Sequence, residues 1–344
     1  MAVWDRASTV SERLAIAAEV RAICHEIGFF YLVNHAVDPE LLTRYMSALK
    51  QFFALPIDVK RQIDKANSPQ FRGWERLGSE LTNDQVDHRE QLDIGTERAV
   101  ILRPEPFYHC LIGPNQWPPE SALPGFRKVV ESYLAAVGKL ARSLLQLLSL
   151  SLDLPENAIE AVFGAEPQPY CKLICYPPTP ANAKGVGAHK DSGFLTLLLQ
   201  DDVGGLQAQN AVGTWVDIAP VENSFVVNIG ELLQIMTHNY FVATPHRVVN
   251  TQTNQVRYSS AYFYSPDLDT ELLPLPLDDE LRAAVRASAR HSSAGLMASR
   301  QALLDGSAGM SGRLQARRFG EQYWQRWVRS YPDIAKKFYP HYVD

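Results

Sequence analysis

Three residues that could bind one metal ion lie in two short segments of the chain. His189 and Asp191 are two positions apart, and alternate residues of a strand point to the same face, so both could bind one ion from a strand or its end. His246 follows much later, which leaves room for several hairpins before the chain returns. Two imidazoles and one carboxylate bind Fe(II) and leave coordination positions open for small molecules. The pattern predicts a metal site.

A candidate carboxylate-binding pair follows the third of these residues. Arg257 and Ser259 are again two positions apart, so their side chains share one face of a strand. The guanidinium fork matches the two oxygens of a carboxylate. Taken singly, Arg257 could form a surface ion pair, and the histidines and the aspartate could be structural. The order and spacing of the whole set favour a functional site.

These motifs resemble the Fe(II)/2-oxoglutarate dioxygenase superfamily, and more narrowly its isopenicillin N synthase-like branch. The resemblance is carried by G-A-H-K-D, P-H-R-V-V and R-Y-S, and it runs from about Arg13 to about Tyr264, with a looser match beyond. It implies a mainly β fold with flanking helices, built on a double-stranded β-helix (jelly roll) core. It also implies Fe(II) as cofactor, 2-oxoglutarate as cosubstrate and O2 as oxidant, with His189, Asp191 and His246 as the iron ligands.

The resemblance further assigns the residues that hold the cosubstrate. Arg257 and Ser259 are implied to bind the distal carboxylate of 2-oxoglutarate, and Tyr176, in Y-P-P, is implied to reach the same group. The chain departs from the family at Ile174, where plant relatives tend to carry Asn. One polar contact is therefore expected to be absent.

Candidate substrate contacts also come from the resemblance. The inward-facing positions are mostly apolar, which implies a partly hydrophobic pocket; they are Val186, Thr196, Leu198, Val248 and Phe263. Loops over the mouth of the barrel add Arg72, Trp74 and Arg89, and for each of these a solvated loop residue is an equal alternative. His238 lies in a polar turn and is interpreted as structural rather than as a fourth ligand.

The implied reaction is the oxidation of a small-molecule metabolite by hydroxylation, desaturation or cyclisation, with release of succinate and CO2. Two alternatives remain open. The first is a 2-oxoglutarate-independent Fe(II) oxidase of the same fold, because such enzymes retain the R-x-S motif. The second is a non-catalytic small-molecule binding protein on the same fold. The identity of the substrate and the oligomeric state cannot be inferred from the sequence.

The composition is that of a globular protein, with 46% hydrophobic and 21% charged residues in 344. A net charge of −5 argues against a nucleic-acid-binding surface. Four cysteines are too few for a disulfide scaffold, and we expect reduced, buried thiols. We find neither a signal peptide nor an apolar run that could span a membrane, so we expect no membrane partner and a cytoplasmic location.

The elements that must position these residues follow from local patterns. Thr9 and Glu12 have the spacing of a capping box before an amphipathic helix that ends near Gly28. Residues 29–33 read as a strand and residues 38–52 as a helix, and residues 66–120 read as mostly loop. A long helix follows over 124–150, with apolar residues at helical spacing.

From Tyr170 the apolar period changes to two, which is typical of strands. We expect strands at 170–176, 186–189, 194–199, 206–209, 215–218, 224–228, 241–249 and 257–264, in a sandwich or jelly roll. Residues 287–312 are rich in Ser, Ala and Gly and suggest weak packing, and residues 313–337 read as a final helix. We expect 66–110 and 287–312 to shield the pocket.

No linker divides the chain, which predicts one catalytic domain over residues 1–344. Its parts are an N-terminal helical and loop part (1–165), a jelly-roll core with the metal site (166–270) and a C-terminal helical part (271–344).

Overall fold

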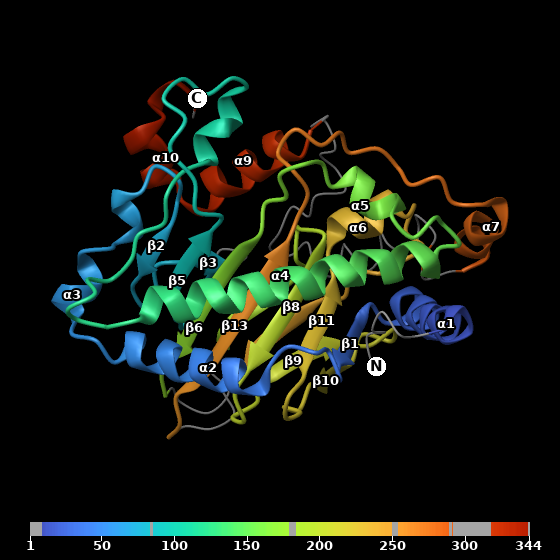
Figure 1. The fold of residues 1–344 in the computed structure, drawn as a ribbon, viewed down its shortest axis with the longest axis horizontal. Coiled ribbons are helices and arrows are strands. Elements are labelled where there is room, and N and C mark those ends of the chain that lie inside the picture. The colour runs from blue at the N-terminus through green and yellow to red at the C-terminus, as the bar shows by residue number, and fades with distance from the viewer. Residues whose placement is uncertain are drawn as a thin grey trace.

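Two antiparallel sheets form the centre of the computed structural model, which describes residues 9–82, 85–178, 184–249, 254–288, 291 and 318–342 (Figure 1). The major sheet has the order β1 (Phe29–Leu32), β11 (Phe225–Ile229), β8 (Leu195–Gln200), β13 (Arg257–Tyr264), β6 (Tyr170–Tyr176), β5 (Glu90–Gly95) and β2 (Gly73–Glu75). The minor sheet has the order β10 (Trp215–Asp217), β9 (Leu206–Gln209), β12 (His246–Val249) and β7 (Lys184–His189). A small hairpin pairs β3 (Leu81–Thr82) with β4 (Gln85–Val86).

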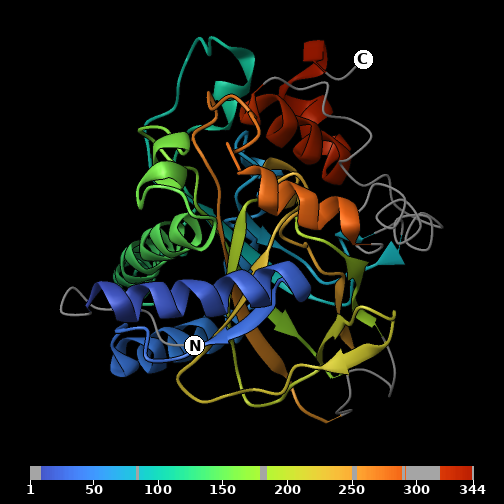
Figure 2. The same ribbon diagram turned by 90° about the vertical axis from the view of Figure 1, so that its right-hand side faces the viewer.

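Helices cover one face of the major sheet, and the minor sheet lies on its other side (Figure 2). The N-terminal helices are α1 (Val10–Glu26), α2 (Pro39–Phe53), α3 (Ile57–Arg61), α4 (Phe126–Ser151) and α5 (Ala158–Val162). The later helices are α6 (Glu231–Met236), α7 (Asp279–Ala287), α9 (Phe319–Ser330) and α10 (Pro332–Phe338). Short 3-10 turns occupy Lys65–Asn67, Phe107–Leu111 and Pro340–Tyr342. The expected β-rich fold with flanking helices is confirmed.

The long helix α4 braces the major sheet from outside. It packs against α1, α2 and the strands β8 and β13, and its buried face is apolar along its length. The capping box predicted at the start of α1 is present, because Thr9 and Glu12 exchange hydrogen bonds there. At the other end of α1, Gly28 adopts φ +67°, a conformation that favours glycine, and the chain turns directly into β1.

A second, smaller apolar core fills the space between the two sheets. Its buried members come from β1, β6, β7, β9, β11, β12 and β13, and they include Val186, Leu206 and Val248 of the minor sheet. Because both sheets direct side chains into this space, a ligand held there would be largely removed from water. The metal-binding candidates lie at the edge of this core.

Residues 66–120 contain more regular structure than the sequence suggested. Strand β5 pairs with β6 along its whole length and belongs to the major sheet, and β2 extends that sheet by one strand. Along β5, Leu92 and Ile94 are buried in the main core, whereas Gln91 and Asp93 alternate to the other face. Most of residues 66–120 lie outside helices and strands, as expected, but β5 was missed because its alternation is short and its polar members Gln91 and Asp93 are buried.

Four charged residues form a buried cluster beneath β5, which we call the lysine cluster: Lys65, Glu75, Asp93 and Lys172. The Nζ atom of Lys65 lies 2.6 Å from Glu75 and 2.5 Å from Asp93, and that of Lys172 lies 3.3 Å from Asp93. Tyr331 adds its hydroxyl, 2.7 Å from Lys65. All four charges are buried and satisfied largely by one another, as buried charges must be.

The strand expected over 241–249 is shorter than predicted. Only His246–Val249 forms β12, and residues 231–236 before it form helix α6. The backbone N–H of Phe241 donates to the Thr237 hydroxyl, and that of Ala243 donates to the side-chain oxygen of Gln234. Side chains from α6 and the turn after it thus take the place of a strand ladder, so the apolar residues are buried without a sheet partner.

The C-terminal helix expected over 313–337 is divided. Helix α9 ends before Tyr331, and Pro332 begins α10. Residues 289–290 and 292–312 of the segment expected to be weakly packed lie outside the described residues, as do 313–317. No helix in the described ranges is both long and apolar enough to cross a membrane.

Candidate metal centre

The two candidate histidines face each other across the minor sheet. Strand β7 ends at His189 and β12 begins at His246, and the antiparallel register pairs these two residues directly. Their ring centres lie 4.4 Å apart. Sheet pairing therefore brings together two side chains that are far apart in the sequence.

Each imidazole is oriented by a hydrogen bond to the backbone carbonyl two residues before it. The Nδ1 atom of His189 lies 2.8 Å from the carbonyl oxygen of Gly187, and Nδ1 of His246 lies 3.1 Å from that of Thr244. A carbonyl only accepts, so Nδ1 carries the proton in both rings. The unprotonated Nε2 atoms then face the space between them, which is the arrangement of a metal-binding histidine.

Asp191 completes the group from the turn after β7. Its Oδ1 atom lies 3.6 Å from Nε2 of His189 and 3.6 Å from Nε2 of His246. Its Oδ2 atom accepts hydrogen bonds from Thr196 at 2.6 Å and from Asn228 at 2.8 Å. Oδ2 is therefore occupied, and Oδ1 is directed at the imidazoles.

The turn that carries Asp191 is held against α6. The backbone N–H of Glu231 donates to the carbonyl oxygen of Asp191 at 2.7 Å. Gly230 precedes it, and a Cβ added there would lie 2.0 Å from the carbonyl oxygen of Gly193. This close approach needs glycine, and it fixes the position of the carboxylate relative to the sheet.

The environment favours the protonation states that metal binding requires. Burial and the neighbouring His246 ring lower the pKa of His189 to about 4. Burial alone would raise the pKa of Asp191, but the two imidazoles and the hydrogen bonds from Asn228 and Thr196 hold it at about 2. At neutral pH the site therefore offers a neutral His189 and a charged Asp191.

These three residues fit a single metal ion. One ligand atom from each lies within 4.8 Å of the others, and His189, Asp191 and His246 are the one such group among the residues that the structure describes. The mixed set of two nitrogens and one carboxylate oxygen suits Fe(II) with open positions. One side of the group opens into a cavity between the sheets.

Arg257 lies in the same cavity, buried and without a carboxylate partner in the described part of the chain. Its Nη1 donates to Ser259 at 3.1 Å and its Nη2 to the side-chain oxygen of Gln200 at 3.2 Å. Its Nε atom and the amide nitrogen of Gln200 have no hydrogen-bond partner among the described residues. Its guanidinium carbon lies 4.8 Å from the ring centre of Tyr176. A buried cation in this condition can accept an external anion.

The cavity brings together most of the residues singled out in the sequence. The metal-binding group, Arg257, Ser259 and Tyr176 all line it. The inward-facing candidates Val186, Thr196, Leu198, Val248 and Phe263 line it too, and so does Arg89. The Thr196 hydroxyl donates its hydrogen bond to Asp191 and so supports the carboxylate.

Arg72 and Trp74 do not line this cavity. Arg72 is buried, and its guanidinium donates to the backbone carbonyls of Thr96 at 2.7 Å and Gly113 at 2.5 Å, which ties two loops together. Trp74 is buried in the main core and donates from Nε1 to Glu90 at 2.6 Å. Both side chains have structural partners away from the metal-binding group.

Sequence reasoning missed several residues of the cavity, above all Asn228 and Lys172. Asn228 is the single polar residue of β11, so an amide in an otherwise apolar buried strand was the available signal. Lys172 lies in β6, where every residue is buried, and a lysine there needs partners from elsewhere in the fold. Ile174, where plant relatives tend to carry Asn, is buried opposite Ser259.

Comparison with known proteins identifies two family matches. Residues 3–120 match the family described as non-haem dioxygenase in morphine synthesis N-terminal, and residues 168–266 match the 2OG-Fe(II) oxygenase superfamily. A 2-oxoglutarate-dependent dioxygenase, frbJ, from Dothideomycetidae sp. is 34% identical over 78% of this chain and 74% of its own. Homoarginine-6-hydroxylase 2-ODD-C23 from Glycine max is 33% identical over 76% of this chain and 81% of its own.

Solved structures of other proteins share the fold of this chain. A full-length Neurospora crassa protein in complex with alpha-KG and 5-formyluracil superposes with a TM-score of 0.68 at 26% identity, covering 79% of this chain and 86% of that chain. JOX2 in complex with 2OG, Fe and JA superposes with a TM-score of 0.65 at 29% identity, covering 78% of this chain and 75% of that chain. The expected jelly roll is confirmed by these matches.

Proposed function

This chain belongs to the 2OG-Fe(II) oxygenase superfamily, and we propose that His189, Asp191 and His246 hold its iron while Arg257 and Ser259 hold 2-oxoglutarate. The protein is an Fe(II)- and 2-oxoglutarate-dependent dioxygenase that acts on a small-molecule substrate. One observation carries the assignment of residues: three ligand atoms converge beside a buried arginine that has no carboxylate partner in the described chain.

In the proposed metal site, hydrogen bonds hold the ligand side chains in the orientation that metal binding requires. Because both Nδ1 atoms are bonded to carbonyl oxygens, the imidazoles need no reorientation to bind through Nε2. Because Thr196 and Asn228 hold Oδ2, Asp191 binds through one oxygen and leaves other positions free. Bound Fe(II), together with 2-oxoglutarate and O2, supplies the oxidising chemistry.

The proposed cosubstrate site uses the charge of Arg257. Its guanidinium and the Ser259 hydroxyl bind the distal carboxylate, and the Tyr176 ring packs beneath the guanidinium. Gln200, hydrogen-bonded to Arg257, keeps the fork in place. The buried position keeps water from this ion pair and so strengthens it.

The substrate is proposed to lie on the inward faces of the two sheets, against Val186, Leu198, Val248, Phe263 and Arg89. These walls are mainly apolar, so they exclude water from the reacting position. The small molecule is hydroxylated, desaturated or cyclised there. Arg72 and Trp74, the other two candidates, shape the neighbouring loops, and any effect of theirs on substrate would be indirect.

Three broader assignments belong to the same proposal. The chain is one catalytic domain, supported by β1, β2 and β5, which come from residues 1–165 and complete the major sheet of the core. It belongs to the isopenicillin N synthase-like branch, supported by its motif order. It works in the cytoplasm, supported by four free, buried cysteines.

The test of the proposed function is the stoichiometry of the reaction. Purified enzyme is loaded anaerobically with Fe(II), binding of 2-oxoglutarate is measured, and metabolites are then screened for O2-dependent succinate release. We expect one succinate and one CO2 per O2 consumed with the true substrate. The matched control is Asp191→Ala, which removes a proposed iron ligand.

Two outcomes would contradict the proposal in different ways. Product formed at full rate without 2-oxoglutarate would indicate an oxidase, with Arg257 binding a carboxylate of the substrate instead. Full iron binding by Asp191→Ala would show that the metal is held elsewhere.

A further inference from the structure

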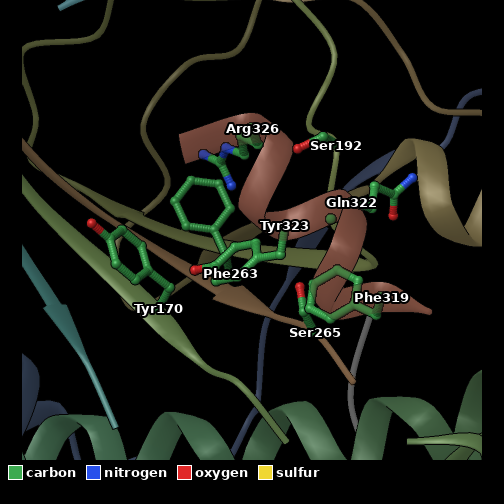
Figure 3. Close-up of a pocket in the computed structure, with 9 residues that line it drawn as sticks. Tyr170, Ser192, Phe263, Ser265, Phe319, Gln322, Tyr323 and Arg326 are labelled. Carbon is green, nitrogen blue, oxygen red and sulfur yellow. The ribbon is translucent and has the colours of Figure 1, made fainter. Parts of the chain in front are cut away.

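A second hollow adjoins the metal-binding cavity on the side of helix α9 (Figure 3). Phe263, on β13, lines both spaces. Ser192 and Gly193, which line the second space, follow Asp191 directly in the chain. The second space, about 10 Å³, holds roughly one water, so only a small terminal group of a molecule bound beside the metal could reach past the Phe263 ring to α9.

The register of β6 and β13 separates this end of the site from the cosubstrate end. Arg257 pairs with Tyr176 at one end of the two strands, and Phe263 pairs with Tyr170 at the other. At a rise of roughly 3.4 Å per residue, Phe263 lies about 20 Å along the strand from Arg257. A five-carbon diacid held at Arg257 is much shorter than that, so a charged group near Phe263 serves a different ligand.

Arg326 supplies such a charge from α9. Its guanidinium carbon lies 5.8 Å from the ring centre of Phe263 and 5.5 Å from that of Trp327. Figure 3 shows the guanidinium above the Phe263 ring, with the Ser192 side chain beside it. Within the described part of the chain, this half-buried guanidinium has neither an ion pair nor a hydrogen bond. The aromatic rings hold its plane and leave its N–H donors available.

The charges that line both spaces point to the same kind of ligand. Arg89 and Lys172 line the metal-binding cavity, Arg326 lines the second, and Asp191 is the one carboxylate among the described residues that line the two. Arg89 and Lys172 are paired with carboxylates behind the cavity wall. Of these three, only Arg326 has no carboxylate partner in the described ranges, so it is the charge that a ligand would meet.

We propose that Arg326 binds the carboxylate of the substrate, and that the substrate is a small, largely apolar monocarboxylic acid. The guanidinium fork binds the carboxylate, and the body of the acid lies along Phe263 toward the metal-binding group. Arg326 is a single cation packed on the rings of Phe263 and Trp327, and one positive charge matches a singly charged carboxylate better than a doubly charged phosphate. This inference rests on the proposed function, because it takes the metal-binding cavity as the place of reaction.

The experiment compares acids with their neutral counterparts in the absence of turnover. Anaerobic enzyme with Fe(II) and saturating 2-oxoglutarate is titrated calorimetrically with a panel of small aliphatic and aromatic monocarboxylic acids, each beside its primary amide and methyl ester. We expect at least one acid to bind about tenfold or more tightly than its amide, the effect of one charge-assisted interaction. The same acid should stimulate succinate release when air is admitted.

Variants on α9 locate the interaction. Arg326→Met should weaken binding of that acid by about tenfold or more and leave binding of its amide unchanged. Arg326→Lys should recover part of the loss, because it keeps the charge without the fork. Arg329→Met, which changes an exposed arginine of the same helix, is the matched control and should bind the acid normally.

The outcomes separate this inference from the proposed function. Iron and 2-oxoglutarate binding are measured in every variant, and the acids are also titrated without either. Absence of iron or 2-oxoglutarate binding contradicts the proposed function, while the acid titration still tests Arg326. The inference is overturned if no acid binds more tightly than its amide, or if Arg326→Met leaves acid binding unchanged. It is also overturned if Arg257→Ala, rather than Arg326→Met, abolishes acid binding.

Discussion

The metal-binding group and the lysine cluster are both buried and polar, but they differ in where their partners come from. In the lysine cluster, Lys65 contacts both Glu75 and Asp93, so the cations are paired within the chain. In the metal-binding group, two Nε2 atoms face the same carboxylate oxygen at 3.6 Å. Nearby, Arg257 is buried with no carboxylate partner in the described chain. In the lysine cluster each charge has an opposite charge from the chain, whereas Arg257 has none among the described residues.

This difference shows how a buried polar group can be interpreted. Burial of charge is costly, and the fold either supplies the counter-charge or leaves it to a ligand. Changes at Lys65, Glu75 and Asp93, the members of the lysine cluster that do not line the metal-binding cavity, should therefore alter stability and spare ligand binding. Changes in the metal-binding group and at Arg257 should do the reverse. Four variants test this contrast, in order of expected effect.

His246→Ala should abolish iron binding and turnover. Loss of a residue that merely supports a ligand costs roughly 10–100-fold in metal affinity, and loss of a ligand itself should exceed that. Iron per chain is measured after anaerobic loading and desalting. His238→Asn is the control, because His238 lies in a left-handed turn outside the metal-binding group and Asn tolerates that backbone. If the His246→Ala protein retained its iron, His246 could not be an iron ligand.

Asp93→Ala should lower the free energy of unfolding by about 3–5 kcal/mol, because it leaves Lys65 and Lys172 buried with one partner fewer. Urea denaturation measures this change. The folded fraction should still bind one iron per chain. Iron loss with unchanged stability would show that the lysine cluster belongs to the functional site instead.

Arg257→Ala should weaken 2-oxoglutarate binding roughly 30-fold or more, about 2 kcal/mol. Iron binding should persist, and the urea midpoint of the ligand-free protein should hardly move, because Arg257 has no carboxylate partner to lose in the described chain. Arg257→Lys should recover only part of the affinity. Arg247→Ala is the matched control, since that arginine packs on Trp215 and bonds Gln207 outside the cavity.

Thr196→Val should give the smallest effect, about tenfold weaker Fe(II) binding, since it removes one of the two hydrogen bonds to Oδ2 of Asp191. Competition with a chelating dye measures the affinity. Unfolding by urea should change little. An equal iron affinity in Thr196→Val and the unmodified protein would mean that Asn228 alone orients the carboxylate.

Some parts of this protein could be predicted from short stretches of sequence. The capping box of α1, the long helix α4 and most of the strands from Tyr170 onward each depend on neighbouring residues, and these predictions matched the structure closely. Strand β5 and the start of β12 could not be predicted in the same way. In β5, buried polar side chains bond to groups far away in the sequence, as Asp93 bonds to Lys65. Before β12, backbone N–H groups bond to side chains instead of to a neighbouring strand, as that of Phe241 bonds to Thr237.

The sequence by itself determined the kind of chemistry, because ligand type and the two-residue spacing of His189 and Asp191 are local properties. Only the tertiary structure decided how those ligands are supported and what surrounds them. Asn228 reaches Asp191 from another sheet, and Arg326 reaches Phe263 from a helix near the end of the chain. Such approaches depend on how sheets and helices pack, and packing joins residues whose separation along the chain carries no periodic signal.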